Sequence, residues 1–280
     1  MRILLTGANG MLGTALRATA SPTIDMIALD KDELDVTSRE QVDERMEAVA
    51  PDVVINAAAL TVVDSVESNA AEAERVNAIA PGLLGDAARR CRAKVIHFSS
   101  DYIFDGESKT AYDEDATANP INVYGRTKLQ GEVSLQSSGA LHLIIRTQWL
   151  FGPAGKHFPS TMWLRACRGV ATRVVDDQVG VPTHVNDLAR ATWKLVGHEG
   201  TLNVVSEGST SWHGVAERIF ARAGASHLLS RCKTVDHRTP AKRPLRTVLS
   251  TRRLKALGVT LPDWTDAMDR YLDRLSAMDD

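Results

Sequence analysis

Tyr124 and Lys128 stand four residues apart in the segment VYGRTKLQGE, a spacing that places two side chains on one face of a helix. A tyrosine hydroxyl has an ordinary pKa near 10, so moving its proton at neutral pH needs about 4 kcal/mol of help from the surroundings. A neighbouring ammonium group and the positive charge of an oxidised nicotinamide would both lower the pKa of this hydroxyl. The pair is a candidate for acid–base catalysis, and the alternative is an exposed pair without chemical function.

Polar side chains also follow one another where the apolar run KVIHF ends, in the segment HFSSDYIFDG at 97–106. Such a cluster at the carboxyl end of a strand forms either a turn or part of a binding site. Ser100 offers a hydroxyl that could hydrogen-bond a reacting carbonyl oxygen, and the next expected helix carries Tyr124. We therefore expect Ser100 and Tyr124 to lie in one site.

Three glycines, Gly7, Gly10 and Gly13, are spaced three apart in TGANGMLG, directly after the apolar run RILL. A glycine turn from strand to helix lets the backbone approach a pyrophosphate, which then lies at the helix N-terminus. Glycines alone are a weak signal because tight turns use them everywhere. The position between a strand and a helix favours dinucleotide binding.

Two further features would suit a dinucleotide. Asp30 ends the second expected strand, where its carboxylate could take the ribose hydroxyls, although it could also be a turn residue. Lys31 beside it would offset the repulsion of a 2′-phosphate, so the choice between NADH and NADPH stays open. The small side chains Ala57, Ala58 and Ala59 would let a flat cofactor pass close to the chain.

The elements that must position these residues are short apolar runs alternating with helical patterns up to about residue 150. The runs lack polar alternation, so we expect them to be strands buried on both faces of a parallel sheet. They are RILLTG, DMIALD, DVVINAAA, KVIHFSS and LHLIIRT. Alternation of this kind predicts a doubly wound α/β fold.

The pattern loosens after residue 150. We expect residues 1–150 to form a dinucleotide-binding domain and residues 151–280 to form mainly a smaller α/β substrate lobe. Two later strands, TRVVDD and TLNVVSEG, lie within residues 171–207 and are expected to return to the first domain. The final segment LPDWTDAMDRYLDRLSAM has an apolar stripe at helical spacing, which indicates packing.

Composition excludes several classes of protein. The chain has 280 residues, 44% of them hydrophobic and 24% charged, with a net charge of −2, so neither general nucleic-acid binding nor membrane-surface binding is expected. Cys91, Cys167 and Cys232 are far apart and suit a reducing compartment. We see no signal peptide and no apolar run near the roughly 20 residues that cross a bilayer. We expect a cytoplasmic protein.

Taken together, the motifs resemble the extended short-chain dehydrogenase/reductases and, more narrowly, the dTDP-4-dehydrorhamnose reductase family. The resemblance covers essentially the whole chain. Beside the glycine loop, its segments are LDVTS, INAAALTVVDSVES, RVNAIAP, SSDYIFDG, PINVYGRTKLQGE, RTQWLFGPAGKHF, VVDDQVGVPT and RPLRTVLST. Together these segments are highly specific for the family.

The resemblance implies a Rossmann fold, NADPH or NADH as the cofactor, and a set of site residues. Ser100, Tyr124 and Lys128 would be catalytic, and Ser100, Asp101 and Trp149 would meet the sugar. The residues that would bind the cofactor are Gly7, Asn9, Gly10, Met11, Leu12, Gly13, Asp30, Asp35, Val36, Ala57, Ala58, Ala59, Tyr124 and Lys128.

The implied reaction is reduction of the C4 carbonyl of a nucleotide-linked 4-keto-6-deoxy sugar, with conversion of dTDP-4-dehydrorhamnose to dTDP-rhamnose as the first choice. A dehydratase of this fold carries Asp-Glu after the strand-end hydroxyl, whereas this chain has Asp101-Tyr102. Two alternatives stay open. One is a reductase of a different dTDP-4-keto deoxysugar in a secondary-metabolite pathway, and the other is a non-catalytic dinucleotide-binding regulatory subunit.

Several positions depart from the family pattern. Ser100 replaces a threonine, Leu60 replaces a tyrosine, and His157 and Arg246 replace asparagines. These changes leave the sugar and its pathway open. Ala15 stands where metal-bridged dimeric members have a glutamate, so we expect no metal site.

The expected partner is a small nucleotide sugar rather than a nucleic acid or a membrane, and the expected protein is a monomer or homodimer. Guanidinium groups suit a diphosphate. In the basic segment HRTPAKRPLRTVLSTRR we single out Arg243 for this role, against the alternative of a solvated basic loop.

Overall fold

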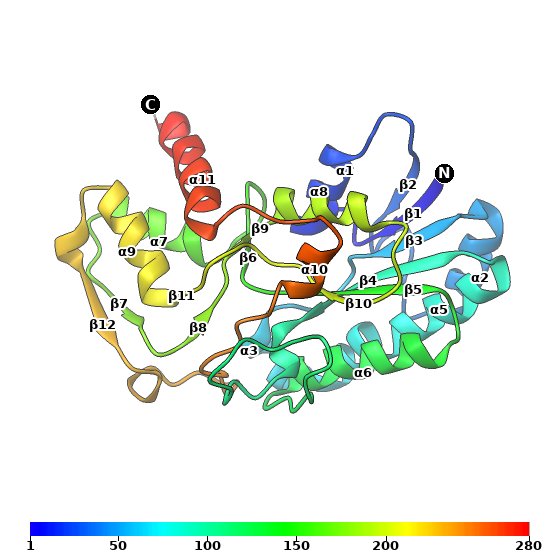
Figure 1. Ribbon diagram of the computed structural model, residues 1–280, viewed down its shortest axis with the longest axis horizontal. Helices are drawn as coiled ribbons and strands as arrows, with labels where there is room; N and C mark the ends of the chain where they lie inside the picture. The colour runs from blue at the N-terminus through cyan, green and yellow to red at the C-terminus, as the bar shows by residue number, and fades with distance from the viewer. Residues whose placement is uncertain (280) are drawn as a thin grey trace.

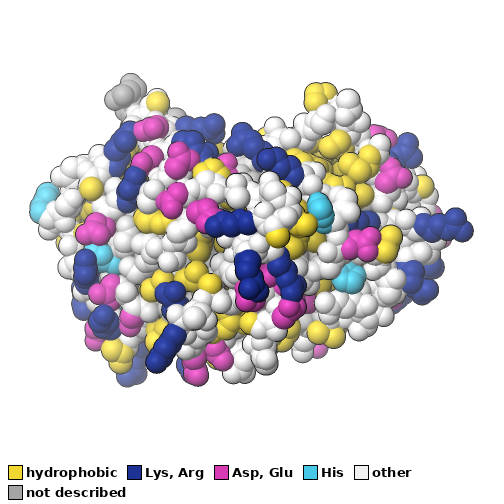
Figure 2. Space-filling model, in the orientation of Figure 1, with side chains coloured by type: hydrophobic (Ala, Val, Ile, Leu, Met, Phe, Trp, Pro, Cys, Tyr) yellow, Lys and Arg dark blue, Asp and Glu magenta, His cyan; other side chains and the backbone are white. Residues whose placement is uncertain are grey.

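The computed structural model describes residues 1–279, with side chains through residue 277. It has two lobes side by side, a larger one built on a parallel sheet and a smaller one that carries the final helix (Figure 1). Lys and Arg side chains are interspersed with Asp and Glu over the face shown in Figure 2. Within the described residues no helix is long and apolar enough to cross a membrane.

The larger lobe contains a six-stranded sheet with the order β10-β5-β4-β3-β1-β2, and every neighbouring pair is parallel. Its strands are β1 (Arg2–Thr6), β2 (Asp25–Leu29), β3 (Val53–Asn56), β4 (Lys94–Ser100), β5 (His142–Thr147) and β10 (Gly200–Asn203). The strand order reverses between β1 and β3. Ligands of open α/β sheets bind outside the carboxyl ends of the strands at such a point.

Helices cover both faces of this sheet, as the doubly wound prediction requires. On one face lie α1 (Met11–Thr19) and α8 (Val185–Leu195), and on the other lie α2 (Arg39–Val49), α5 (Ala80–Cys91) and α6 (Val123–Ser137). Short elements near the carboxyl edge are α3 (Val63–Ser68), α4 (Ala70–Ala73), the π-helical segment η1 (Glu74–Ile79), the 3₁₀ turn η2 (Asp101–Ile103) and α10 (Arg252–Ala256).

The strands form because Val, Ile and Leu fill both faces, and β1, β3, β4 and β5 are buried almost throughout. The prediction of burial on both faces is wrong for β2. Met26, Ile27 and Ala28 are only half-buried. The reason is that β2 is an edge strand, paired with β1 alone.

The smaller lobe packs three helices around an apolar core of its own. These are α7 (Phe158–Cys167), α9 (Trp212–Arg222) and α11 (Trp264–Asp279). Its remaining elements are β7 (Thr172–Val175), β8 (Val179–Gly180), β11 (Thr210–Ser211), β12 (Leu229–Cys232) and the 3₁₀ turns η3 (Ser226–Leu228) and η4 (Thr234–Asp236). The expected stripe of the last helix packs here through Met268, Tyr271 and Leu272, all buried.

Of the two later strands expected to return to the main sheet, one does and one does not. β10 pairs with β5, whereas β7 pairs with β12 in the smaller lobe. Because α8 also packs on the main sheet, the chain passes between the lobes repeatedly. The joint between them includes a parallel pair, β6 (Leu150–Phe151) and β9 (Thr183–His184).

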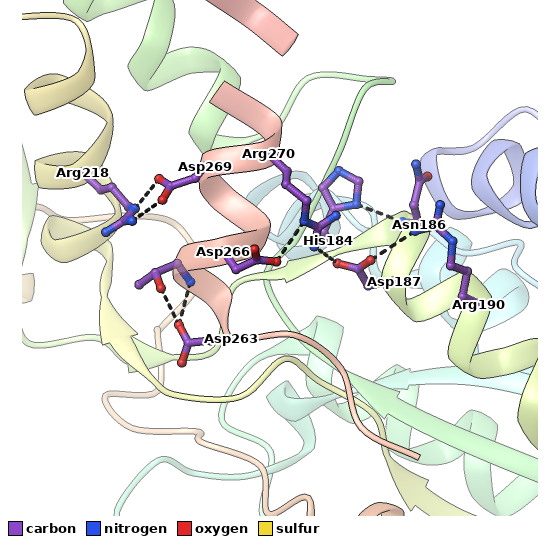
Figure 3. Close-up of polar contacts among 10 residues, drawn as sticks. His184, Asn186, Asp187, Arg190, Arg218, Asp263, Asp266, Asp269 and Arg270 are labelled. Carbon is purple, nitrogen blue, oxygen red and sulfur yellow. Dashed lines mark hydrogen bonds and ion pairs between the residues drawn. The ribbon is translucent and has the colours of Figure 1, made fainter. Parts of the chain in front are cut away.

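A polar network ties α11 of the smaller lobe to α8 of the larger one (Figure 3). Asp187, buried in the first turn of α8, accepts a hydrogen bond from Arg270 Nη2 at 2.6 Å and from Arg190 Nη1 at 3.4 Å. Arg270 also donates to Asp266 on its own helix at 2.9 Å. On the far side of α11, Arg218 of α9 forms an ion pair with Asp269. The Arg270–Asp187 pair is therefore a bridge between lobes.

Candidate active site

Ser100 ends β4 at the centre of the sheet, and its side chain is buried. Its hydroxyl donates to Asp101 Oδ1 at 3.0 Å and accepts from the Tyr102 backbone N–H at 3.2 Å. The strand therefore ends in polar side chains that bond to one another at the carboxyl edge. This is the location expected for a site residue of this fold.

Tyr124 lies in the first turn of α6, which begins where Asn122 Oδ1 caps the Gly125 N–H at 2.8 Å. The ring of Tyr124 meets the ring of Tyr102 edge-on, with 5.5 Å between centroids. Burial raises the pKa of Tyr124, and a hydrogen bond with Ser100 opposes that rise. The structure thus brings Ser100 and Tyr124 together, as predicted.

Lys128 lies one turn further along α6 and is buried. Its ammonium donates to the Phe98 carbonyl at 2.6 Å, and its Nζ lies 3.4 Å from His97 Nε2. Burial lowers the pKa of Lys128 to about 8. The sequence-based expectation that Lys128 lowers the pKa of Tyr124 is wrong for the protein alone, because burial dominates and the ammonium is directed at β4.

Three buried side chains on neighbouring strands, Thr6, Asn56 and His97, form a hydrogen-bonded row that ends at Lys128. His97 Nδ1 lies 3.1 Å from Asn56 Nδ2, and Asn56 Oδ1 accepts from the Thr6 hydroxyl at 2.8 Å. Burial and the nearby Lys128 charge hold the pKa of His97 well below its ordinary value. The row joins β1, β3 and β4, so the side chain of Lys128 has a defined position.

The glycine loop between β1 and α1 fits a phosphate group. Gly7 has a φ of +67°, and a Cβ added at Gly13 would lie 2.2 Å from the Gly7 carbonyl oxygen. Gly10 caps α1 without a side chain, and Thr14 donates the first α-helical bond back to Gly10 at 2.9 Å. Backbone N–H groups at the start of α1 thus face outward for an anion. Asn9 is exposed on the same loop, and Met11 and Leu12 open the helix.

The other residues expected to bind a cofactor lie along the carboxyl edge of the sheet. Asp30 follows β2, and Ala57, Ala58 and Ala59 follow β3 and are half-exposed. Asp35 accepts hydrogen bonds from the Thr37 N–H and hydroxyl, at 2.9 and 2.7 Å, which lower its pKa. Val36 beside it is buried.

The loop after β3 is held by a residue that the sequence reasoning missed. Asn77, on η1 and fully buried, accepts from the Leu60 N–H at 2.9 Å and donates to the Leu60 carbonyl at 3.0 Å. π-Helical turns frequently lie at functional sites. This one directs the amide side chain of Asn77 at residues 57–60, which we call the alanine loop. Leu60 and Tyr124 both pack against the small apolar cluster of Val66, Ala73 and Val123.

A cavity of about 690 Å³ lies where η2 and α3 face the smaller lobe. It is lined by Val62, Val63, Asp64, Tyr102, Phe158, Thr161, Met162, Arg165, Thr172, Arg173, Val174, Val175, Gln178, Trp212, His237, Thr239 and Arg243. Because Tyr102 touches Tyr124 and also lines this cavity, the cavity is adjacent to the expected catalytic residues.

Arg243 lies in the cavity wall, as its expected contact with a diphosphate requires. Its Nη2 pairs with Asp64 at 2.8 Å, and its guanidinium lies 5.9 Å from the centre of the Tyr102 ring. His237 and Thr239 of the same segment also line the cavity, whereas its last two arginines lie elsewhere. Arg252 and Arg253 form ion pairs with acidic residues 113–115, outside the cavity lining of the described chain.

Two expected sugar contacts lie elsewhere in this structure. Among the described residues, the cavity lining contains neither Trp149 nor Asp101. Trp149 has a φ of +48°, and its ring stacks on Trp212 with 3.6 Å between centroids. Trp212 is the residue that faces the cavity. The carboxylate of Asp101 is enclosed by protein donors instead of facing the cavity.

His157, one of the departures from the family pattern, acts as a helix cap. Its Nδ1 accepts the Ser160 N–H at 3.3 Å at the start of α7, and its Nε2 lies 2.7 Å from the Gly152 carbonyl oxygen. An asparagine commonly fills the same capping position. His157 therefore keeps the start of α7 in place, and burial lowers its pKa, which favours a neutral ring.

Known proteins resemble this chain along its whole length. The family model described as RmlD substrate binding domain matches residues 1–277. A dTDP-4-dehydrorhamnose reductase of Burkholderia thailandensis is 38% identical, with 96% of this chain and 97% of the relative covered. A probable dTDP-4,6-dihydroxy-2-methyloxan-3-one 4-ketoreductase of Streptomyces antibioticus is 39% identical, with 99% and 97% covered. The structure of dTDP-4-dehydrorhamnose reductase from Bacillus anthracis in complex with NADP has a TM-score of 0.94 at 33% identity, with 98% and 99% covered.

Proposed function

The chain belongs to the RmlD family, which includes dTDP-4-dehydrorhamnose reductases, and from this premise we propose that it reduces the C4 carbonyl of a dTDP-linked 4-keto-6-deoxy sugar with NADPH or NADH. The reaction belongs to deoxysugar biosynthesis, with dTDP-rhamnose as the first product to test. The observation that carries the proposal is the hydrogen bond between Ser100 and Tyr124, with Lys128 one helical turn away. The three residues lie beside a cavity large enough for a small-molecule ligand.

Reduction of a ketone requires a hydride and a proton, and a reduced nicotinamide supplies the hydride when it is bound. Tyr124 is the proposed proton donor. The raised pKa of Tyr124 keeps its hydroxyl protonated at neutral pH, which is the state that a donor needs. Ser100 would donate a hydrogen bond to the carbonyl oxygen of the substrate that receives this proton. Lys128 is mostly protonated at neutral pH, one turn further along α6, with its ammonium held by the Phe98 carbonyl.

The cofactor and the substrate would bind mainly to different lobes. We propose that the glycine loop, Asp30, Asp35, Val36 and the alanine loop bind the cofactor, and that the cavity takes the sugar nucleotide. Arg243 would meet the diphosphate. This division assigns residues 1–150, together with α8 and β10, to the dinucleotide and the rest of the chain mainly to the substrate.

A second candidate is a reductase that acts on another dTDP-4-keto sugar. The Streptomyces antibioticus relative supports it, because its identity to this chain, 39%, is as high as that of the rhamnose-pathway relative, 38%. A regulatory subunit without activity is less well supported. It would need neither Tyr124 and Ser100 in contact nor a buried Lys128 behind them.

The free cysteines suit a reducing compartment. Cys91 and Cys232 carry thiols, which agrees with a protein that works in the cytoplasm. We propose this location and a monomeric or homodimeric state, with a small nucleotide sugar as the partner and no nucleic acid.

The test follows the loss of reduced-nicotinamide absorbance with dTDP-4-dehydrorhamnose and with other dTDP-4-keto sugars. We expect consumption of cofactor in step with product, and a loss of kcat of at least about 100-fold in Tyr124→Phe, since general acid catalysis contributes 10²–10⁴-fold. Tyr271→Phe is a matched control, because Tyr271 is buried in the core of the smaller lobe. Product without net cofactor use would instead indicate an epimerase or dehydratase, and a fully active Tyr124→Phe would remove the proposed role.

A further inference from the structure

Asp101 is a buried carboxyl group that the proposed mechanism does not use. Its side chain is 1% exposed, directly beside Ser100. Oδ1 accepts from the Ser100 hydroxyl at 3.0 Å, whereas Oδ2 accepts from Gln148 Nε2 at 2.9 Å and from the Thr247 hydroxyl. All of its neighbours at hydrogen-bond distance are therefore neutral donors.

An ionised Asp101 would oppose the reaction in two ways. The Ser100 hydroxyl has a single proton, and a carboxylate that accepts this proton directs it away from the substrate oxygen. The Tyr102 N–H donates to a lone pair of Ser100 Oγ and leaves the single hydroxyl proton directed at Asp101. A negative charge on Asp101 also raises the pKa of Tyr124 and so weakens it as an acid.

We propose that Asp101 is a positioning residue that works in its protonated form, in which Oδ1–H donates to Ser100 and leaves the Ser100 hydroxyl free to donate to the reacting oxygen. The inference rests on the proposed function and adds to it a residue that controls the direction of one hydrogen bond. The proton of Asp101 stays on Asp101, and Tyr124 still supplies the proton of the product.

The surroundings of Asp101 support a protonated state close to physiological pH. Burial raises the pKa of Asp101 to about 6, and the hydrogen bonds from Thr247, Ser100 and Gln148 limit that rise. The titratable groups that face it are Tyr102 on η2 and Tyr124 on α6, both neutral at this pH. No cation of the described chain is among the causes of its shift. A bound substrate and cofactor bring phosphate charges, which would raise the pKa further.

The first test is the pH dependence of kcat in wild type and Asp101→Asn. In the wild type we expect kcat to fall about tenfold for each increase of one in pH above the pKa of Asp101 in the complex. An asparagine with Nδ2 towards Ser100 and Oδ1 towards Gln148 and Thr247 reproduces the protonated pattern. The falling limb should therefore disappear in Asp101→Asn, whatever its absolute kcat. A second limb from Lys128, whose pKa is about 8, should remain in both proteins.

The second test uses the hydroxyl that stabilises the ionised form. Thr247→Val removes one donor to Oδ2, so the pKa of Asp101 should rise and the limb should move to higher pH, by about 0.5 or more. Thr247→Ser keeps the hydroxyl and should keep the limb at its wild-type pH. A purely structural role for this cluster would lower activity without moving the limb in either variant.

An infrared titration reads the carboxyl group without turnover. A protonated-carboxyl band that titrates in the wild type, is missing in Asp101→Asn and moves to higher pH in Thr247→Val is the expected result. If the band is absent at every pH above about 5, or if Asp101→Asn keeps the fall of kcat that begins at the pKa of Asp101, the inference is overturned. If the wild type reduces no keto sugar, the proposed function fails, and the infrared titration still decides the protonation of Asp101.

Discussion

Burial, more than pairing of opposite charges, determines the acid–base character of the residues around Tyr124. Burial raises the pKa of Tyr124, lowers that of Lys128 to about 8 and raises that of Asp101 to about 6. The pKa values of Asp101 and Lys128 therefore lie closer together than their ordinary values, whereas the pKa of Tyr124 moves further from both. Because burial is the largest cause in each case, the pKa values of Tyr124, Lys128 and Asp101 should all change when water gains or loses access to the site.

Arg243 provides a test at the scale of one residue. A charge-assisted contact with phosphate contributes roughly 1.5–3 kcal/mol, so Arg243→Ala should raise the KM of the nucleotide sugar about tenfold or more. The diphosphate does not change its charge during hydride transfer, and kcat should fall much less. Initial rates at varied substrate concentration separate the two constants.

Arg252→Ala is the matched control, because Arg252 comes from the same basic segment but pairs with Asp113 and has a side chain 79% exposed. It should leave KM at the wild-type value. Raised salt should weaken wild-type binding more than binding by Arg243→Ala. An unchanged KM in Arg243→Ala would show that the phosphates of the substrate lie elsewhere.

The sequence predicted the members of the candidate site that depend on local spacing and missed the neighbours that depend on tertiary contacts. Tyr124 and Lys128 follow from one helical turn, and Ser100 from the end of one strand. Trp212 faces the cavity because it stacks on Trp149, a contact between residues 63 positions apart that no local pattern encodes. The enclosure of Asp101 likewise depends on Gln148 and Thr247, from distant segments.

At the scale of elements, α6 lies unusually close to the helix that contains the π-helical segment. A Cβ added at Gly131 of α6 would lie 2.1 Å from the Asn77 carbonyl oxygen of η1. Asn77 in turn holds the loop that contains Leu60. The glycine therefore sets the distance between α6, which carries Tyr124, and the loop proposed to receive the cofactor.

Gly131→Ala should destabilise the protein by about 1–3 kcal/mol, because overpacking a contact with backbone forces the two helices apart. Gly197→Ala is the control, since a methyl group there would meet no described heavy atom within 4 Å. Equilibrium unfolding in urea gives both free energies. Equal stabilities for the two variants would mean that α6 can shift at little cost.

The periodicity of the sequence predicted the main strands and helices but not the π-helical turn or the placement of β7. The segment AEAERVNAIAP has an ordinary helical pattern, and the turn widens where η1 meets Gly131. The two valines of β7, Val174 and Val175, would suit a strand in either lobe. Their partner, β12, lies more than 50 residues later in the chain. Strand pairing of this kind depends on the whole fold.

For the whole molecule, the ion pair between Arg270 and Asp187 should contribute more to the free energy of unfolding than the exposed side chain of Arg270 suggests. Asp187 is buried, so Arg270→Ala leaves a carboxylate with only the longer contact to Arg190. We expect a loss of about 1–3 kcal/mol in the free energy of unfolding. A double-mutant cycle with Asp187→Ala should give a coupling energy of about 1 kcal/mol.

Arg218→Ala removes a comparable pair, with Asp269, that lies within the smaller lobe (Figure 3). Both of its partners are well exposed, so the expected loss is smaller, about 0–1 kcal/mol. If the two arginine variants lose the same stability, the bridge has no special role in holding the lobes together. A coupling energy near zero would lead to the same conclusion.

The position of β10 has a consequence for the way the chain is made. β5 ends at Thr147, but the strand that covers its outer edge begins only at Gly200, after the first elements of the smaller lobe. At roughly 5–20 residues per second, a ribosome needs about 3–11 s to deliver the missing strand. During that interval the nascent sheet presents an open, apolar edge of the kind that pairs with other chains. Pairing with β10 ends this exposure only after the first elements of the smaller lobe have been made.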